Sequence, residues 1–298
     1  MVNPFDICMK VGSKMVKLDR RREYFLILDC ETACLPHVAD LAPAQRKTVG
    51  ISKPLIYDIG WTIIDRQGRT YDRKNFLISE IFSVPSVFNT AYYADKRPLY
   101  LEKLQAGEII LTDWRTATKE LEDALNAVKA VGAYNAAFDF KKAIPFTELY
   151  INKLYSPDFH DWLDYQNYLI DRAANGFRNQ RTTSRKPADE NEIFRFRGGV
   201  YPLFDIWALA CEHIMDSDEY RDYAMDEGWV TDSGKYYKTS AEVAYRFISR
   251  NREFEEAHTA LDDAEIESEI LTSIIRKDKK KLKMGIVAFP FRIVGTVR

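Results

Sequence analysis

The chain has 298 residues, of which 46% are hydrophobic and 30% are charged, so it is not a mainly disordered protein. Its 43 Lys and Arg residues nearly balance 45 Asp and Glu, and the net charge of -2 excludes a uniformly basic nucleic-acid-binding surface but not local basic patches. No apolar run reaches the roughly 18 residues that a membrane span needs. Four cysteines and a polar N-terminus without a signal-like apolar region favour a cytoplasmic protein.

The first quarter of the chain is expected to hold three strands. Residues 1–22 read as an N-terminal arm, and the apolar run at 24–30 is typical of a buried central strand. Residues 32–55 contain three prolines and are expected to form a long loop. Residues 56–79 alternate around a Gln-Gly turn, which predicts a β-hairpin.

The next part of the chain is expected to alternate between helix and strand. Residues 80–111 have a mixed pattern. Apolar residues at helical spacing then predict a helix that begins after Thr112 and ends at Gly132. A short strand at 131–135 and a second helix over 138–154, kinked by an internal proline, should follow.

Residues 156–202 differ in character because basic and aromatic side chains interleave there, which predicts a basic insertion or a mobile loop. Three further helices are expected, at 205–215, 241–250 and 261–276, with Asp205 and Ser240 as the caps of the first two and a polar link at 216–237. A tail over 277–298 begins with a basic run. Its apolar segment at 285–294 is expected to pack on the core or to add an edge strand. The order of elements indicates one α/β domain over residues 23–276.

The first candidate site residues are the carboxylates of Asp29 and Glu31 at the end of the first predicted central strand. Side chains two apart on a strand point to the same face, with Cys30 on the other face. Two carboxylates that close repel each other, and a hard cation such as Mg²⁺ or Mn²⁺ would relieve the repulsion. The alternative is a pair of solvated acids at a strand end.

Two later groups add polar side chains. Asp139 follows a short strand and opens a helix, where it is either a site residue at the carboxyl edge of the sheet or a helix cap. His258 lies in a turn before a helix whose first residues include Asp263. A histidine near a metal-bound water is suited to proton transfer at neutral pH. The alternative reading, acids favoured by the helix dipole, gives no role to His258.

The ordered combination of these motifs resembles the DEDDh 3′–5′ exonucleases, a family that includes DnaQ-like proofreading subunits and RNase T. The motifs are D-x-E-T at 29–32, N-x-x-F-D at 135–139 and H-x4-D at 258–263. The segments at 57–64 and 205–210 also resemble the second strand and an intermediate helix of that family. The resemblance implies an α/β, ribonuclease H-like mixed β-sheet flanked by helices, in a single domain with insertions.

The resemblance also implies roles for individual residues. Two Mg²⁺ or Mn²⁺ ions, about 3.5–4 Å apart, would be bound by four carboxylates. Those carboxylates would be Asp29, Glu31, Asp139 and Asp263. His258 would be the general base, and Thr259 stands where the tyrosine subclass of these nucleases has its tyrosine. The terminal nucleotide would contact Thr32, Leu35, Asn135 and Phe138.

The chain departs from the family at three places near the substrate. Ala33-Cys34 replaces a frequent Thr-Gly, and Tyr134 replaces a frequent histidine. The loop after Ala33 is long. These differences bear on substrate fit more than on the chemistry. Zinc is not expected, because Cys30 and Cys34 lack the C-x2-C spacing.

The basic segments are candidates for holding nucleic acid despite the small net charge. Arg178, Arg181 and Arg185 would grip phosphates, with aromatic stacking on bases by Phe194, Phe196 or Tyr201. The alternative is a solvated loop. The basic run at 276–283 would bind a nucleic-acid backbone or a partner, or simply complete a helix end.

The sequence thus predicts an enzyme that releases nucleoside 5′-monophosphates from 3′ ends, with single-stranded DNA as the first substrate and RNA as the alternative. A non-catalytic nucleic-acid-binding or polymerase-docking module is the competing hypothesis. A polymerase or another replication protein is the expected partner, and no membrane partner is expected. The oligomeric state does not follow from the sequence.

Overall fold

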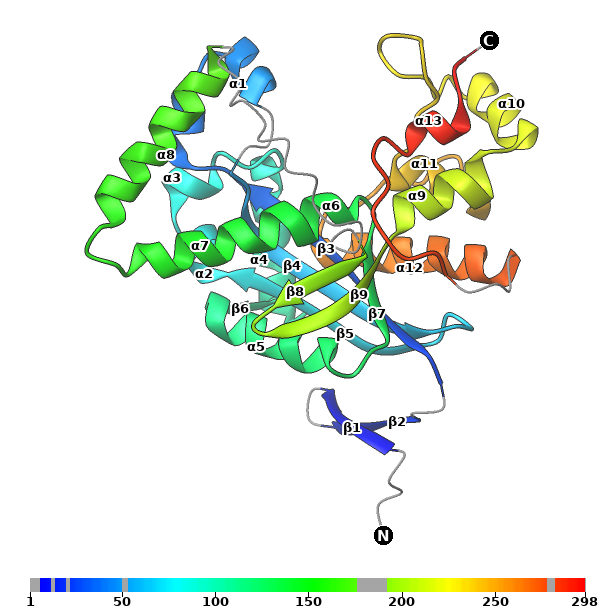
Figure 1. The fold of residues 1–298 in the computed structure, drawn as a ribbon, viewed down its shortest axis with the longest axis horizontal. Helices are drawn as coiled ribbons and strands as arrows, with labels where there is room; N and C mark the ends of the chain where they lie inside the picture. Colours follow the sequence, from blue (N-terminus) through cyan, green and yellow to red (C-terminus); the bar gives the residue numbers. More distant parts are fainter. Residues whose placement is uncertain are drawn as a thin grey trace.

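The computed structural model describes residues 6–11, 14–19, 22–49, 53–175, 192–277 and 282–297. Its centre is a seven-stranded mixed β-sheet with helices packed on both faces, so the predicted α/β class is confirmed (Figure 1). Among the described residues, no helix is both long enough and apolar enough to span a membrane.

The main sheet has the strand order β6-β5-β4-β3-β7-β9-β8, and a separate pair, β1-β2, precedes it. Strand β3 lies at the centre, antiparallel to β4 and parallel to β7. Strands β5 and β6 are parallel, as are β7 and β9, whereas β4–β5 and β8–β9 are antiparallel. The strands are β1 (Asp6–Val11), β2 (Lys14–Asp19), β3 (Tyr24–Ala33), β4 (Leu55–Asp65), β5 (Thr70–Ile78), β6 (Ile110–Thr112), β7 (Ala130–Ala133), β8 (Ile193–Phe196) and β9 (Gly199–Asp205).

The helices lie on either side of this sheet and at its ends (Figure 1). The α-helices are α1 (Pro43–Val49), α2 (Ser79–Phe82), α3 (Pro85–Phe88), α4 (Arg97–Ala106), α5 (Trp114–Leu125), α6 (Ala136–Phe138), α7 (Ile144–Leu154), α8 (Phe159–Ala174), α9 (Ile206–Ala210), α10 (Asp218–Asp226), α11 (Ala241–Ser249), α12 (Ala260–Lys277) and α13 (Phe291–Val294). Short 3-10 helices are η1 (Pro36–Asp40) and η2 (Ala94–Lys96), and π-helices are η3 (Asp139–Ala143) and η5 (Cys211–Met215).

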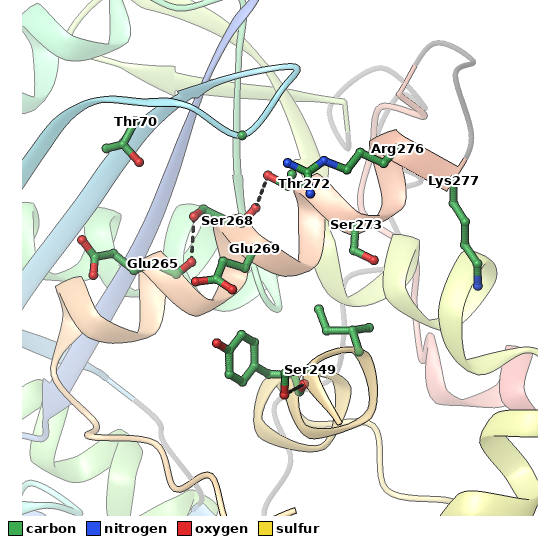
Figure 2. Close-up of a pocket in the computed structure, with 12 residues that line it drawn as sticks. Thr70, Ser249, Glu265, Ser268, Glu269, Thr272, Ser273, Arg276 and Lys277 are labelled. Atoms are coloured by element: carbon green, nitrogen blue, oxygen red, sulfur yellow. Dashed lines mark hydrogen bonds between the residues drawn. The ribbon is translucent and has the colours of Figure 1, made fainter. Parts of the chain in front are cut away.

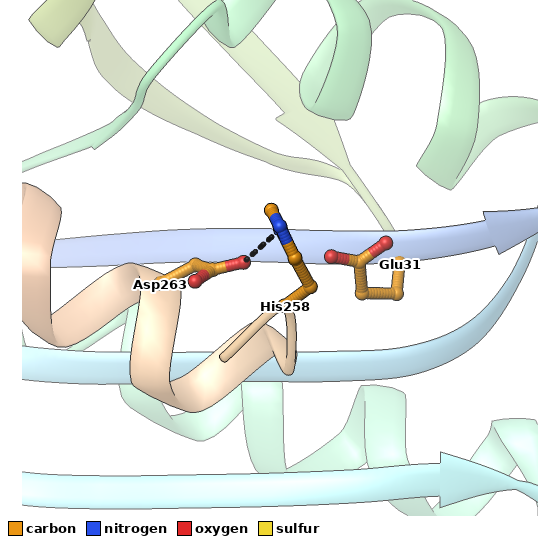
Figure 3. Close-up of side chains that lie close together, drawn as sticks. All are labelled: Glu31, His258 and Asp263. Carbon is orange, nitrogen blue, oxygen red and sulfur yellow. Dashed lines mark ion pairs between the residues drawn. The ribbon is translucent and has the colours of Figure 1, made fainter. Parts of the chain in front are cut away.

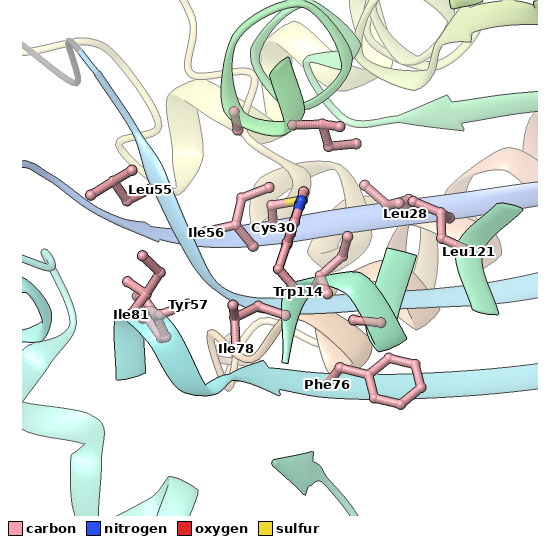
Figure 4. Close-up of a cluster of buried hydrophobic side chains, with 14 of the residues drawn as sticks. Leu28, Cys30, Leu55, Ile56, Tyr57, Phe76, Ile78, Ile81, Trp114 and Leu121 are labelled. Carbon is pink, nitrogen blue, oxygen red and sulfur yellow. The ribbon is translucent and has the colours of Figure 1, made fainter. Parts of the chain in front are cut away.

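Each face of the sheet has its own hydrophobic core because side chains alternate along the strands. On β3, Leu28 and Cys30 belong to the first core, which includes Trp114 and Leu121 of α5 (Figure 4). Ile27 faces the second core, formed with α9, α11 and α12. The sequence pattern therefore puts the next residues of that second face, Asp29 and Glu31, on the side covered by α12.

Several predicted elements are confirmed. The central strand begins at Tyr24 as expected and runs on to Ala33, and β4 and β5 form the predicted hairpin. Asp205 and Ser240 cap α9 and α11 by accepting hydrogen bonds from backbone N–H groups. The helix predicted after Thr112 is capped instead by Asp113.

Two expectations for the first half of the chain were wrong. Residues 32–55 are not one long loop, because they contain η1 and α1. Gly132 does not end a helix, since α5 ends at Leu125 and Gly132 lies in β7. A Cβ at Gly132 would meet the ring of Phe204, so this glycine allows β7 and β9 to pack closely.

The expected basic insertion at 156–202 also needs correction. Residues 159–174 form α8, and residues 193–205 form β8 and β9 of the main sheet. Phe194, Phe196 and Tyr201 are buried in the first core, so they do not present faces for stacking on bases. Their alternation with exposed residues is the pattern of an edge strand.

The chain ends differ in part from expectation. Residues 6–11 and 14–19, expected to belong to an N-terminal arm, form the antiparallel strands β1 and β2, and the link at 216–237 contains α10. The C-terminal apolar segment packs on the core as predicted. Val294 is buried there, and Gly285 forms an isolated parallel bridge to Phe204 of β9.

Candidate active site

The first pair of candidate residues lies at the carboxyl end of β3. Asp29 is paired in register with Gly60 of β4, and Glu31 with Asp58. Both carboxylates are partly buried, and a register shift follows directly between Glu31 and Thr32. The irregularity shifts the pairing by one residue, so that Thr32 and Ala33 pair with Ile56 and Leu55. Bulges of this kind are common beside functional sites.

Asp139 reaches the same region from the neighbouring parallel strand. β7 ends at Ala133, and the backbone turns through Asn135 in the left-handed region, with φ of 72°, into α6 and the π-helix η3. Asp139 is the first residue of that π-helix and is 2% exposed. A π-helical turn at a functional side chain is a recurring feature of proteins.

His258 and Asp263 come from the turn before α12 and from its first turn. One ligand atom each of Glu31, His258 and Asp263 can be chosen so that all lie within 4.8 Å of one another. The Nδ1 atom of His258 lies 4.0 Å from Oδ2 of Asp263. Figure 3 shows these three side chains converging from β3 and from the start of α12. The structure therefore brings together residues more than two hundred positions apart in sequence.

The carboxylates at this place interact strongly with one another. Burial raises the pKa of Asp29, Glu31 and Asp139 well above their usual ranges, and neighbouring carboxylates raise these pKa values further. Burial, with Asp29 as the largest Coulombic contributor, raises the pKa of Asp263 to about 9. Coulombic repulsion raises these pKa values only if the four carboxylates lie near one another.

The donor set fits a hard divalent cation. Oδ1 of Asp139 and Oδ1 of Asp263 are buried without a hydrogen-bond partner, which costs free energy unless a ligand engages them. Carboxylate oxygens are the ligands preferred by Mg²⁺ and Mn²⁺. Cys30 and Cys34 are buried and free, and neither belongs to the candidate metal cluster found in the described part of the chain.

The surroundings of His258 favour a neutral imidazole. Burial lowers its pKa, and the positive charge of Lys96 lowers it further. Its ring stacks on Tyr93, with ring centroids 4.2 Å apart and an interplanar angle of 15°. Its Nδ1 atom also lies 3.7 Å from Oε2 of Glu256, a carboxylate whose pKa burial raises to about 7.

Asp58 is a buried residue beside the candidate site that was not predicted from the sequence. It is completely buried on β4, and its Oδ2 accepts a 2.9 Å hydrogen bond from the backbone N–H of Ala260. Two residues along, a Cβ at Gly60 would lie 2.6 Å from the carbonyl carbon of Ala260. Asp58 and Gly60 together seat the N-terminus of α12 on β4. The signal was present, since a lone Asp inside an otherwise apolar strand rarely lacks a purpose.

A second set of missed residues comes from η2 and α4, in the segment whose pattern looked mixed. Nζ of Lys96 donates a 2.8 Å hydrogen bond to the carbonyl of Ala257. The hydroxyl of Tyr100 donates a 3.2 Å hydrogen bond to the carbonyl of His258. His258 has a φ of 53°, which is uncommon for a histidine, so these contacts hold a strained turn in place.

Glu267, one turn further along α12, is another buried carboxylate near the site. Its Oε2 accepts a 2.9 Å hydrogen bond from the backbone N–H of Tyr134. This bond ties α12 to the end of β7, just before the turn that leads to Asp139. Burial raises the pKa of Glu267 well above its usual range, and Asp29 and Asp139 contribute to the shift.

The expected nucleotide-contacting residues have mixed outcomes. Thr32 and Phe138 are partly exposed, and each is next to a candidate carboxylate in sequence; Asn135 is exposed and lies four residues before Asp139. Leu35 is fully buried in the first core, so contact with a nucleotide in this conformation was a wrong expectation. Arg178, Arg181 and Arg185 lie outside the described residues.

Two cavities formed by described residues lie near α12, and the first of them adjoins the candidate site. A pocket of about 660 Å³ is lined by His258, Tyr92, Tyr93, Lys96 and Arg246, among others. A larger pocket of about 810 Å³ lies between α11, the later turns of α12 and the β4–β5 turn (Figure 2). There the hydroxyls of Ser268 and Thr272 donate to carbonyls of their own helix, and none of the candidate carboxylates lines it.

No family model and no curated protein matches this chain. The geometry and chemistry of the site itself therefore have to indicate its function.

Proposed function

We propose that this chain is a metal-dependent 3′–5′ exonuclease with a ribonuclease H-like sheet, acting on the 3′ ends of nucleic acid. The observation that carries the proposal is the approach of His258, Glu31 and Asp263 to within 4.8 Å, next to the interacting carboxylates Asp29 and Asp139. The mixed sheet, in which the carboxylate-bearing β3 pairs with an antiparallel β4 and a parallel β7, supports the finer fold assignment.

The four carboxylates would hold two Mg²⁺ or Mn²⁺ ions, as their oxygen donors and unpartnered buried atoms favour. Bound divalent ions would make a water more acidic and neutralise charge on the scissile phosphodiester. The protein's part is to present Asp29, Glu31, Asp139 and Asp263 from three separate elements in one place. Each carboxylate must be deprotonated to bind, which the ions themselves favour.

His258 would act as the general base. Its lowered pKa leaves the imidazole neutral near pH 7, so a ring nitrogen is free to accept the proton of an attacking water. Tyr93 and Lys96 hold the turn from one side, while Asp58 fixes its far end through Ala260. Fixing the base in this way is what makes proton transfer efficient.

The pocket beside His258 supports a nucleotide as the substrate unit. Its volume of about 660 Å³ is within the range of small-ligand sites. Tyr92 is 87% exposed at its edge and offers a ring face on which a base can stack. The charged side chains that line the pocket are those of Lys96, Arg246, Asp95, Glu242, Glu255 and Glu256. Single-stranded DNA is the first substrate proposed, and RNA is the alternative.

The proposal is tested with 5′-labelled DNA and RNA oligomers of the same sequence, incubated with Mg²⁺, with Mn²⁺ or with EDTA. We expect a ladder that shortens from the 3′ end, releases nucleoside 5′-monophosphates and disappears with EDTA. Asp29→Asn and His258→Ala should each lower the rate by about 100-fold or more, as expected for loss of a metal ligand or a general base.

The control for these variants is Asp171→Asn, on α8, whose carboxylate contacts His37 and not the site. It should digest the oligomers at the wild-type rate. Wild-type rates in Asp29→Asn or His258→Ala would show that another site cleaves the substrate. Absence of any metal-dependent shortening of both oligomers would reject the exonuclease.

A further inference from the structure

A basic hollow lies against η3 and α7, and it shares no lining residue with the pocket beside His258. It has a volume of about 530 Å³. Its walls carry three lysines and apolar side chains, and none of its lining residues is acidic. The lining residues are Val49, Lys53, Pro54, Lys141, Lys142, Pro145, Phe146 and Leu149. The chain as a whole has a net charge of -2, whereas the side chains that line this hollow carry only positive charge.

Among the residues that the structure describes, two of the three lysines lack anionic partners. Within the described part of the chain, no carboxylate forms an ion pair with Lys53 or Lys142, while Nζ of Lys53 lies 5.3 Å from the centroid of the Phe146 ring. Lys141 donates a hydrogen bond to the carbonyl of Ile193, which turns its ammonium group toward β8. Burial lowers the pKa of Lys53, so this cation is held in a partly dehydrated place, with no counter-charge from the described part of the chain.

The apolar part of the hollow is exposed enough to take part in binding. Leu149 is 43% exposed, and Phe146 is half-buried with its ring near that of Trp162, at 6.1 Å between centroids. Ammonium groups beside an aromatic and aliphatic floor suit a ligand that has both a phosphate and a planar base.

Each wall of the hollow is connected to a segment that carries a candidate carboxylate. On one side, Asp139 and Lys141 belong to the same π-helix. On the other side, Lys53 and Pro54 lead directly into β4, whose first residues pair with Thr32 and Ala33, next to Glu31. The hydroxyl of Thr147 on α7 accepts a 2.9 Å hydrogen bond from the N–H of Ile56, which joins the two walls.

We propose that this hollow binds the phosphodiester backbone of a single nucleic-acid strand upstream of the 3′ end that enters the carboxylate site. This inference rests on the proposed exonuclease function for its direction, but the binding itself can be measured without hydrolysis. Lys53 and Lys142 each contact a phosphate, and Phe146 and Leu149 contact a sugar or base. The carboxylates alone would repel the phosphates of the strand. The two lysines attract these phosphates and so raise the affinity for the strand.

The test compares two double variants that remove the same charge. Lys53→Gln with Lys142→Gln alters the hollow, and Lys119→Gln with Lys235→Gln removes two lysines from α5 and from the loop before α11. Both are made in the full chain carrying His258→Ala, with Mg²⁺ present, so that a 5′-fluorescein oligothymidylate is bound and not consumed. Anisotropy gives the Kd over a range of salt concentrations, and thermal unfolding checks that each variant folds.

We expect the hollow variant to bind the oligomer about tenfold more weakly at low salt, with a slope of log K against log salt reduced by about 1.4, for two lost contacts at about 0.7 each. The control variant should keep the slope. Equal affinities and slopes in the two variants would overturn the proposal. A calorimetric titration with inorganic phosphate tests whether the hollow binds free phosphate instead of the phosphodiester backbone of the oligomer. Lysine-dependent binding of phosphate, without lysine-dependent binding of the oligomer, would also overturn it.

Hydrolysis of the oligomer by the wild-type chain is measured separately. If the wild type shortens oligomers and the hollow variant binds like the control, the strand site fails while the exonuclease stands. If no hydrolysis occurs but the hollow variant alone loses binding, the exonuclease fails while the strand site stands.

Discussion

Asp58 has no exposed surface, and both of its carboxylate oxygens accept hydrogen bonds from N–H donors. One donor is the side chain of Asn75 on β5, and the other is the backbone of Ala260 at the start of α12. Burial raises the pKa of Asp58 to about 7, although both hydrogen bonds favour the charged form. A single buried side chain thus links the hairpin to the turn that carries His258.

Asp58→Asn should therefore be costly, although the two side chains have almost the same shape. The amide of the new Asn has one oxygen and one NH₂ group, so its NH₂ group would face one of the two N–H donors, Asn75 or Ala260. That buried donor would lose its hydrogen bond, which costs about 1–3 kcal/mol of stability. The rate of 3′-end hydrolysis should fall by about 100-fold as the turn shifts. Urea unfolding and the oligomer assay measure the two effects.

Asp72→Asn is the matched control for that variant. Asp72 is also buried, on the next strand, but its Oδ1 has no hydrogen-bond partner. The amide substitution there should change stability and rate little. A loss in Asp72→Asn as large as that in Asp58→Asn would mean that the effect comes from burial of any acid in this sheet.

Tyr93 acts through His258 and is a positioning residue. Tyr93→Leu should lower kcat while leaving KM nearly unchanged, because the histidine ring loses the surface against which it stacks. Tyr93→Phe keeps the ring and should restore the rate. The NMR resonances of the His258 ring should shift in Tyr93→Leu, through loss of the ring current, and stay near wild type in Tyr93→Phe. Equal kcat values in all three proteins would remove this role.

At the scale of elements, the start of α12 is the part whose placement decides the site. It packs on β4 at Gly60, and Glu267 on its second turn accepts a hydrogen bond from Tyr134 at the end of β7. One helix is thus fixed to the strands on both sides of β3. Because Asp263 lies between these two attachments, its distance from Asp29 and Asp139 is set by backbone packing.

Gly60→Ala tests this packing. The added methyl group would lie 2.7 Å from the Cα atom of Leu261, and neither backbone can yield without moving the helix. We expect a loss of about 1–3 kcal/mol in stability, as in other overpacked cores, and a weaker affinity for Mn²⁺ by calorimetry. Unchanged Mn²⁺ affinity in a folded Gly60→Ala protein would show that α12 does not position the metal site.

The elements that bear the candidate site residues were predicted from the sequence better than the elements that surround the candidate site. The apolar run of β3, the hairpin and the caps at Asp205 and Ser240 are local signals that tertiary contacts did not override. β8 and β9 were missed because the charges of Arg195 and Arg197 outweighed the alternation of Phe194 and Phe196. The contacts of Tyr93 and Asp58 with the His258 turn join distant segments, which no local pattern encodes.

For the molecule as a whole, the free energy of unfolding should depend on pH and on metal. Burial and repulsion raise the pKa of Asp58 to about 7 and that of Asp263 to about 9, so the folded chain holds protons that the unfolded chain releases at lower pH. The contribution of these protons to the free energy of unfolding is fully present below about pH 4, the ordinary carboxylate pKa. It is lost as the pH rises through the pKa values of the folded chain.

In EDTA we therefore expect the Tm to fall between about pH 4 and pH 9. Mg²⁺ or Mn²⁺ should raise it again at the upper end of that range by binding only the folded state. Thermal unfolding by circular dichroism measures both trends. In Asp29→Asn with Asp263→Asn, the fall with pH and the rescue by metal should both shrink. A Tm in EDTA that rises over this range would contradict the electrostatic description of the site.

The most direct test of the account is to locate bound metal. Crystals grown with Mn²⁺ should give anomalous scattering peaks between the carboxylates of Asp29, Glu31, Asp139 and Asp263, with His258 beside them. The peaks should be absent from crystals of Asp29→Asn grown in the same way. Manganese at another place, or no manganese among these carboxylates at concentrations that support hydrolysis, would contradict the claim that they form one metal site.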